Sequence, residues 1–272
     1  MACLAVFKLN SGIDFTGGSI LEVKYQRERP AIEALRENLE DIVGPVFIQP
    51  TDSNGLIIRM QGINEETHQH VLSILNEDYN AEELRFELIG PVIGRELREK
   101  TTIVVILSLL AIVLYIAFSF RKVQKPVSSW QYSLFSVLAL FHDVLIPIGI
   151  LAILGEFHGV QVTIPIVVAF LIVVGYSINN TVVVFDRIRE NLLKRVGGTF
   201  SETVDKSLNQ TLTRSINTSL TTLFVLIAIF FLGGETLKYF ALVLIIGIIA
   251  GTYSSFFLVS PFLVVWLNWR QK

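Results

Sequence analysis

Residues 163–185 read TIPIVVAFLIVVGYSINNTVVVF, and this stretch decides the fold class. It contains no Asp, Glu, Lys or Arg. A helix needs roughly 20 mostly apolar residues to cross a bilayer, and this stretch meets that length. It is too long and too apolar for an amphipathic helix of a soluble domain, so it predicts a membrane span.

Four further segments share this length and apolar character. Together they predict five spans, over residues 102–120, 131–154, 163–185, 215–232 and 239–266. Residues 12–100 are instead polar and charged. The chain is 52% hydrophobic, with a mean hydropathy of +0.59, and the apolar excess lies after this segment. We therefore predict a soluble domain over residues 12–100 and an α-helical multi-pass transmembrane domain over residues 101–272.

Composition excludes several functional classes. Residues 12–100 hold about 17 acidic and about 9 basic side chains, without the clustered cations that nucleic-acid binding requires. Cys3 is the only cysteine, so no internal disulfide and no zinc spacing exist. His68 and His70 lie on a polar helix, where we interpret them as solvated surface residues. No nucleotide loop or nucleophile–base motif is present, so we expect no cofactor, no metal and no enzymatic activity.

Basic residues predict the orientation of the spans. They follow the first, third and fifth spans: Arg121, Lys122 and Lys125; Arg187, Arg189, Lys194, Arg195 and Lys206; Arg270 and Lys272. Lys238 is the only Lys or Arg in the other two loops, which follow the second and fourth spans. Since cytoplasmic loops carry the excess of Lys and Arg, residues 12–100 are predicted to be extracytoplasmic. Tryptophans at the span ends fit interfacial anchors: Trp130, Trp266 and Trp269.

An extracytoplasmic domain must itself be exported. Residues 2–7 are apolar but too short to span a membrane. We interpret residues 1–11 as the remnant of a truncated first transmembrane helix. The alternative is a frayed start without a structural role.

The soluble segment predicts a ferredoxin-like α+β sandwich. Its periodicity gives the order strand, helix, strand, strand, helix, strand, over residues 20–25, 30–42, 46–49, 56–60, 65–76 and 84–89. This βαββαβ order is typical of that fold. Apolar strand residues are expected to form its core: Leu21, Val23, Ile57 and Ile58.

Ionisable residues inside spans are rare and usually functional. His142 and Asp143 lie near the middle of the second span, and Asp143 is the only deep carboxylate. It is a candidate for carrying a proton or locking helices. A hydrogen-bonded structural pair is an equal alternative.

Two further polar groups interrupt the third and fourth spans. Tyr176 and Ser177 lie four and three residues before Asn180, so the three share a helix face. This face predicts a functional cluster, with a helix-packing seam as the alternative. Arg214 opens the fourth span beside several hydroxyl and amide side chains, which predicts a polar, hydrated stripe. Alternatively, Arg214 extends to the cytoplasmic interface.

Small residues recur in the last span. Gly247, Gly251 and Ser255 follow a spacing of four, which is typical of closely packed membrane helices. We interpret this series as a packing surface.

Several motifs, taken together and in order, resemble the SecF family of protein-export membrane proteins. They are GIDFTGG at residues 12–18, FHDV at 141–144, GYSINNTVVVFDRIREN at 175–191, and the stretch over residues 210–222. The resemblance covers nearly the whole chain. The family residues that it picks out are Gly12, Asp14, Gly17, Gly18, Asp186 and Arg187.

The resemblance implies a fold of the RND transporter type, with six helices and an extracytoplasmic domain between the first two. It implies SecD as a pseudo-symmetric partner, the SecYEG translocon, preprotein substrates, and YajC and YidC as further partners. It also implies residence in the bacterial inner membrane and use of the proton-motive force to promote preprotein export.

The chain departs from the family pattern at two places. The first helix is absent or short. Asn180 stands where the family usually has Asp, and that Asp is thought to act with an Arg that matches Arg214. The carry-over of a proton-relay role to Asn180 is therefore open.

Two other functions remain as alternatives. One is half of an RND exporter for lipids or small molecules. The other is a structural SecD partner without a proton pathway of its own, which Asn180 favours. Co-purification with SecD and SecYEG distinguishes the exporter from the translocase subunit.

Overall fold

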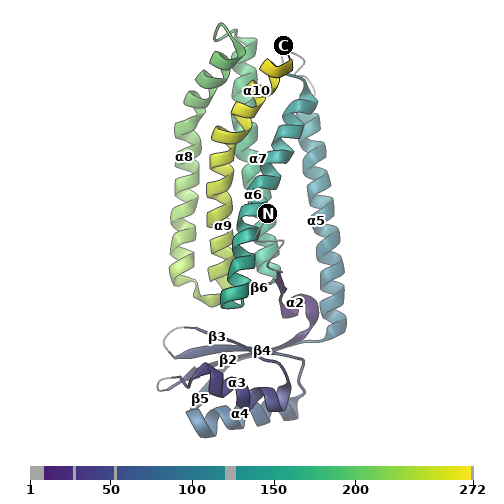
Figure 1. Cartoon of the computed structure of the whole chain (residues 1–272), viewed down its shortest axis with the longest axis vertical. Coiled ribbons are helices and arrows are strands. Elements are labelled where there is room, and N and C mark those ends of the chain that lie inside the picture. The colour runs from purple at the N-terminus through teal and green to yellow at the C-terminus, as the bar shows by residue number, and fades with distance from the viewer. Residues whose placement is uncertain (1–8, 27–28, 52–53, 120–126, 271–272) are drawn as a thin grey trace. The chain divides into compact units, whose positions relative to one another are not determined.

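The computed structural model describes residues 9–26, 29–51, 54–119 and 127–270. The chain forms two compact units, which are described separately. Among the described residues, the α+β unit comprises those between 9 and 103 and those of 152–164, and the helical unit comprises those between 104 and 151 and between 165 and 270. Figure 1 shows both units with their elements labelled.

The α+β unit has the predicted alternation of strands and helices. Its elements are β2 (Gly18–Tyr25), α3 (Ile32–Val43), β3 (Phe47–Pro50), β4 (Gly55–Met60), α4 (Glu65–Tyr79) and β5 (Ala81–Ile89). The sheet order is β3-β4-β2-β5, and every neighbouring pair is antiparallel. The two helices lie on one face of the sheet (Figure 1).

The core of this unit lies between the sheet and its two helices. Leu21, Val23 and Ile58 are fully buried there, as predicted. The helices contribute Leu35, Leu39, Val71 and Leu75. Ile57 is also buried but lies outside this cluster. The reason is that successive residues of a strand point to opposite faces, so Ile57 cannot join Ile58.

The interpretation of His68 as a solvated residue is wrong. Only 4% of its surface is exposed, and its ring stacks on Phe86 with centroids 3.8 Å apart. Its Nδ1 lies 3.4 Å from Glu65 Oε1. His68 shares a helix face with the buried Val71 because the two are three positions apart. His70 is exposed, as predicted.

Three short elements of the α+β unit were not predicted. They are β1 (Asn10–Ser11), α2 (Ile13–Thr16) and β6 (Gln161–Val162). β1 and β6 pair in parallel, although they are far apart in the sequence. Most of the expected helix remnant over residues 1–11 lies outside the described residues, and its last two residues form β1.

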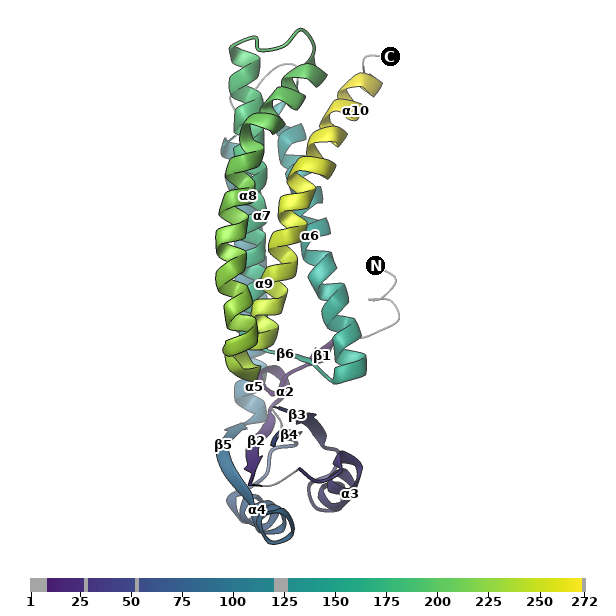
Figure 2. The same ribbon diagram turned by 90° about the vertical axis from the view of Figure 1, so that its left-hand side faces the viewer.

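The helical unit contains long helices that run side by side (Figure 2). They are α5 (Pro91–Ser119), α6 (Ser129–His158), α7 (Ile164–Leu193), α8 (Phe200–Leu232), and a last helix formed by α9 (Gly234–Ser254), the π-helix η1 (Ser255–Val259) and α10 (Ser260–Arg270). In the described part of the chain, five helices are long and apolar enough to cross a membrane, which matches the five predicted spans.

Most helices extend beyond the predicted spans. The third span was expected to end at residue 185, but α7 continues to Leu193. Its 30 residues are roughly 45 Å long, compared with a hydrocarbon thickness of about 30 Å. Hydropathy detects only the segment that can sit in lipid, so charged helix ends were assigned to loops.

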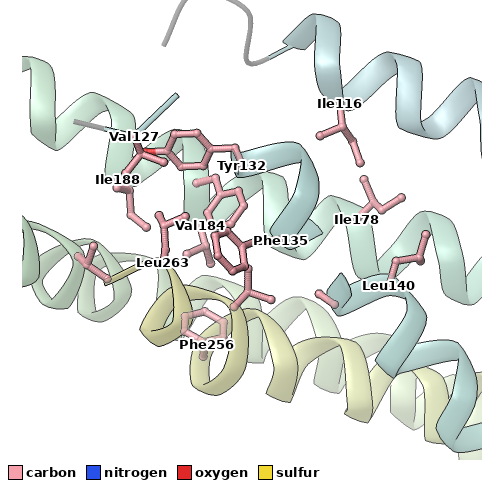
Figure 3. Close-up of a cluster of buried hydrophobic side chains, with 14 of the residues drawn as sticks. Ile116, Val127, Tyr132, Phe135, Leu140, Ile178, Val184, Ile188, Phe256 and Leu263 are labelled. Atoms are coloured by element: carbon pink, nitrogen blue, oxygen red, sulfur yellow. The ribbon is translucent and has the colours of Figure 1, made fainter. Parts of the chain in front are cut away.

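Apolar side chains from several helices form the core of this unit (Figure 3). Tyr132 and Phe135 of α6 meet Val184 of α7 there. Phe256 of η1 and Leu263 of α10 belong to the same cluster. This cluster joins the last helix to α6 and α7.

Helices α7 and α9 approach closely along one seam. The pairs in contact or hydrogen-bonded are Val173 with Gly247, Ser177 with Gly251, and Thr181 with Ser255. Each pair has the same sequence separation, so the two helices run parallel and in register. A Cβ on Gly247 would lie 2.2 Å from Val173 Cγ2. The glycine series is therefore a packing surface, as predicted, and Ser255 adds a hydrogen bond of 3.1 Å to Thr181.

Candidate functional site

Buried polar side chains gather between α6, α7, α8 and α9 in the helical unit. They form two groups. The Asp143 cluster comprises His142, Asp143, Ser177 and Ser254, and the Asn180 cluster comprises Tyr176, Asn180, Ser219 and Thr252. Polar groups at membrane depth must contact protein or water. In both clusters the polar side chains largely meet this requirement by hydrogen-bonding to side chains of neighbouring helices.

The Asp143 carboxylate is fully buried, at 0% exposure. Its Oδ2 accepts hydrogen bonds from Ser177 Oγ at 2.5 Å and from Ser254 Oγ at 2.8 Å. Its Oδ1 lies 2.9 Å from His142 Nδ1. Both carboxylate oxygens thus have partners, and one side chain of α6 joins α7 and α9.

This geometry leaves two chemical roles for Asp143. Hydrogen bonds to a carboxylate are stronger than neutral ones, so the cluster can lock three helices together. The His142 side chain is 33% exposed. An imidazole that contacts both a buried carboxylate and the surroundings can also exchange a proton with it. No Lys or Arg side chain of the described residues forms an ion pair with Asp143.

Asn180 lies at the centre of the second cluster and is 3% exposed. Its Nδ2 donates to Thr252 Oγ1 over 3.4 Å. Thr252 Oγ1 lies 2.7 Å from Ser219 Oγ, which also accepts from the Tyr176 hydroxyl at 3.4 Å. The amide therefore takes part in a chain of neutral hydrogen bonds that connects α7, α9 and α8.

Arg214 does not join this chain. Its side chain is exposed and makes no hydrogen bond or ion pair within the described ranges. The buried residues of α8 include Thr211, Ser215 and Ser219, which are four positions apart. Arg214 precedes Ser215 by one residue, which turns it about 100° away from that face. The side-chain hydrogen bond of Asn180 goes to Thr252.

Arg214 instead belongs to an exposed polar face of α8, defined by Arg214, Asn217, Thr218 and Thr221. This α8 polar face lies in a helix long and apolar enough to cross a membrane. An Arg and an amide are unfavourable against lipid, so any part of this face that lies within the bilayer requires water or another protein.

Arg187 lies at the far end of α7 and forms a separate group with α8. Its Nε donates to Gln210 Oε1 at 2.8 Å, and Asn191 Nδ2 donates to the same oxygen at 2.9 Å. Asp186 is exposed, and its Oδ1 lies 3.5 Å from Arg189. Arg187 and Asn191 thus fix the register of α7 and α8 at this end.

The glycine motif lies in the α+β unit. The Asp14 carboxylate accepts a hydrogen bond from the Ile164 backbone N–H at 2.8 Å. Gly17 and Gly18 have φ angles of 75° and 146°, which side chains rarely adopt. Gly12 is buried against the chain that precedes α7.

Sequence reasoning missed the partners that α8 and α9 supply. Ser219, Thr252 and Ser254 were not identified as site residues. The available signal was the set of hydroxyl residues in an otherwise apolar span, since such groups hydrogen-bond across membrane helices. No cluster of three or more His, Cys, Asp or Glu that could bind a metal occurs in the described part of the chain.

Comparisons with known proteins point to one family. Residues 70–269 match the family described as "Protein export membrane protein SecD/SecF, C-terminal", and residues 4–28 match "SecD/SecF GG Motif". The protein translocase subunit SecF of Thermobaculum terrenum is 42% identical over 97% of this chain and 87% of its own length. The Synechocystis SecF is 37% identical over 96% of this chain and 84% of its own. The Thermus thermophilus SecDF is 36% identical over 96% of this chain and 35% of its own length.

Solved structures agree with these relatives. The crystal structure of SecDF from Thermus thermophilus, a translocon-associated membrane protein, superposes with a TM-score of 0.86 at 35% identity. The match covers 98% of this chain and 36% of the SecDF chain, so the chain spans about a third of that protein. A heavy metal efflux pump matches 80% of this chain and 22% of its own length, with a TM-score of 0.50 at 13% identity, which shows a likeness of fold alone.

Proposed function

Because the chain belongs to the SecD/SecF family of protein-export membrane proteins, we propose that it is an accessory subunit of the Sec protein translocase. It acts with SecD and uses the proton-motive force to promote preprotein export. The observation that carries this proposal is the similarity to SecF subunits over nearly the whole of this chain and more than four fifths of theirs. The role is one of transport and involves no bond chemistry in a substrate.

Two observations support SecD as the direct partner. One relative combines the two subunits in a single SecDF chain, of which this chain matches about a third. The α8 polar face is exposed on a helix long and apolar enough to cross a membrane, and any part of it within the bilayer needs polar contacts. A SecD helix with complementary polar side chains would supply them. SecYEG, YajC and YidC remain proposed partners of the assembled complex.

The α+β unit supports a ferredoxin-like assignment. Its βαββαβ order and its sheet order β3-β4-β2-β5 both favour that fold. We place it, as residues 12–100, outside the bacterial inner membrane, with the transmembrane domain over residues 101–272. The distribution of basic residues supports this orientation.

The orientation is testable at Gly198, in the connection between α7 and α8. In a Cys3→Ser background, Gly198→Cys is expected to react with a membrane-impermeant thiol reagent only after the inner side is opened. Asp41→Cys, an exposed position of α3, is the matched control and should react in cells whose outer membrane alone is permeabilised. Labelling at Gly198 from outside would reverse the topology and remove the Sec assignment.

Asn180 bears on how protons cross the complex. An amide has no proton to release at physiological pH, whereas a carboxylate does. We propose that Asn180 carries no proton and that this chain, the SecF half of the pair, contributes to export through conformational change. A carboxylate on the matching SecD helix carries the proton. The saturated hydrogen bonding of Asp143 supports a locking role for that residue.

Asn180→Asp is therefore expected to leave the export rate unchanged. A protonated Asp keeps nearly the shape of Asn and an O–H that can donate to Thr252, so in that form the packing of α7 against α9 survives. The measurement is export of a preprotein in cells that carry the chain with its SecD. If the wild-type chain does not support export and Asn180→Asp does, the chain is a disabled variant. That result would refute the proposal that it functions without a proton carrier at Asn180.

Co-purification tests the proposed assembly. The tagged chain, extracted in mild detergent, is expected to retain SecD in equal amount and SecYEG in part. Absence of both would support the alternative of an RND exporter half. At present the likeness to an efflux pump extends to fold alone, so we do not favour that alternative.

A further inference from the structure

The glycine motif is built into a junction of the α+β unit. β1 pairs with β6 through Asn10 with Gln161 and Ser11 with Val162. The Gly12 N–H donates to Val162 O at 2.8 Å. These contacts fasten the segment before the sheet to the segment before α7.

Side chains at both ends extend this attachment. Asn10 Nδ2 donates to Gly155 O, near the end of α6, at 2.9 Å. Asp14 Oδ2 accepts from the Ile164 N–H, the first residue of α7, at 2.8 Å. The first N–H groups of a helix lack partners within the helix, so Asp14 caps α7 from a distant part of the chain. Its negative charge is also favourable at that end of the helix dipole.

Glycines allow the backbone to close around this junction. A Cβ on Gly12 would lie 2.9 Å from Val162 O. A Cβ on Gly17 would lie 2.9 Å from Pro91 Cα, where α5 begins, and a Cβ on Gly94 would lie 2.7 Å from Gly17 N. The segment from Asn10 to Gly17 thus touches the starts of both α5 and α7.

We propose that Asp14 is a positioning residue. Its carboxylate accepts the hydrogen bond from the Ile164 N–H and so holds the segment Asn10–Thr16 against the first residue of α7. We call this hydrogen bond the Asp14 tie, and it stays formed (closed) while the protein functions. α7 continues from Ile164 to Asn180, so the tie connects the strand β2 to the helix that bears the Asn180 cluster. The effect on export rests on the proposed function, whereas the tie itself does not.

Two substitutions separate positioning from a chemical role. Asp14→Asn keeps a side-chain carbonyl that can accept from the Ile164 N–H, but it loses the charge. Asp14→Ala loses the acceptor. Asp41→Ala removes an exposed acid of the same unit and serves as the control.

Hydrogen exchange of the full chain in lipid nanodiscs tests the tie directly. In Asp14→Ala, the Ile164 amide is expected to exchange about fivefold faster or more, as for loss of a helix cap. In Asp41→Ala it should exchange as in wild type, and in Asp14→Asn, which keeps the acceptor and loses only the charge, it should exchange more slowly than in Asp14→Ala. An unchanged rate in Asp14→Ala would overturn the proposal.

A disulfide provides the second test. Neighbouring strands lie about 4.8 Å apart, within the Cα separation that a disulfide accepts, so Ser11→Cys with Val162→Cys in a Cys3→Ser background is expected to cross-link under oxidation. In cells depleted of their own SecF, Asp14→Ala should lower export several-fold, and the cross-link should restore it until a reductant is added. Asp14→Asn should export like wild type.

Other results contradict the proposal in distinct ways. In one, Asp14→Asn lowers export as much as Asp14→Ala does; in another, the oxidised cross-link fails to restore export. Either result would mean that the carboxylate does more than position α7. If Asp14→Ala does not accumulate, export is measured instead in Asp14→Asn and in an otherwise wild-type protein that carries the cross-link. A cross-link that blocks export would then refute the proposal that the tie stays closed. If wild type itself supports no export, the proposed function fails, and hydrogen exchange still tests the tie.

Discussion

Asp143→Ala is expected to abolish the chain's support of export and to lower its stability. The substitution leaves the hydroxyls of Ser177 and Ser254 and the imidazole of His142 without their shared acceptor. Leaving a buried hydrogen-bonding group without its partner costs about 1–3 kcal/mol, and Asp143→Ala leaves more than one such group. The measurements are the melting temperature of the purified chain and the export rate in cells that supply SecD.

Asp143→Asn is the matched control. The amide oxygen can accept both serine hydroxyls, and the amide N–H can donate to His142 Nδ1 when the imidazole proton is on Nε2. We therefore expect this variant to melt near wild type and to retain most export. Loss of export in a folded Asp143→Asn protein with SecD intact would make Asp143 essential for proton transfer, against our assignment of that role to SecD.

Gly251→Leu is expected to have an effect of similar size, because it separates α7 from α9. A Cβ at Gly251 would lie 3.2 Å from Ser177 Cα and 3.5 Å from Asp143 Oδ2. A full leucine side chain would displace the Asp143 cluster as well as the helix. Overpacking of this kind costs roughly 1–3 kcal/mol, and the lost hydrogen bonds add to it. We expect poor accumulation and a much lower melting temperature.

Gly149→Leu is the control for Gly251→Leu. Gly149 lies within α6, and a Cβ there would meet no atom within 4 Å. The two variants introduce the same side chain into membrane helices, but only one position is closed. Equal melting temperatures for both variants and wild type would show that the α7–α9 seam is not tightly packed.

The spans and the α+β order could be predicted because each depends on a local pattern. The stretch 163–185 is apolar over a membrane thickness, and alternation in β2 marks Leu21 and Val23 as one face. These patterns do not depend on distant residues. The ends of α7 and α8 were misplaced because charged residues there are helical through packing that hydropathy does not measure.

The site was predicted only in part because its contacts join distant segments. Asp143, Ser177 and Asn180 were identified as unusual polar residues in spans, which a single sequence can show. Their partners Ser254 and Thr252 depend on how α9 aligns with α7, including the turn into η1. The resemblance left open whether Arg214 acts with Asn180, and the rotation of α8 that exposes Arg214 depends on packing between helices.

The same limit applies to the α+β unit. His68 lies on a helix of polar composition, and only the stacking on Phe86 of β5 reveals that it is buried. The pairing of β1 with β6 and the cap of Asp14 on Ile164 connect residues about half the chain apart. No periodicity in the sequence indicates such a contact.

Export in cells depleted of their own SecF and SecD tests the central claim most directly. A pulse-labelled preprotein is followed across the membrane while the chain and its SecD are supplied together or singly. We predict that the pair restores processing of the preprotein, that neither subunit alone does so, and that dissipating the proton gradient abolishes the gain. Failure of the pair to restore export, although both subunits accumulate and co-purify, would contradict the assignment to the Sec translocase.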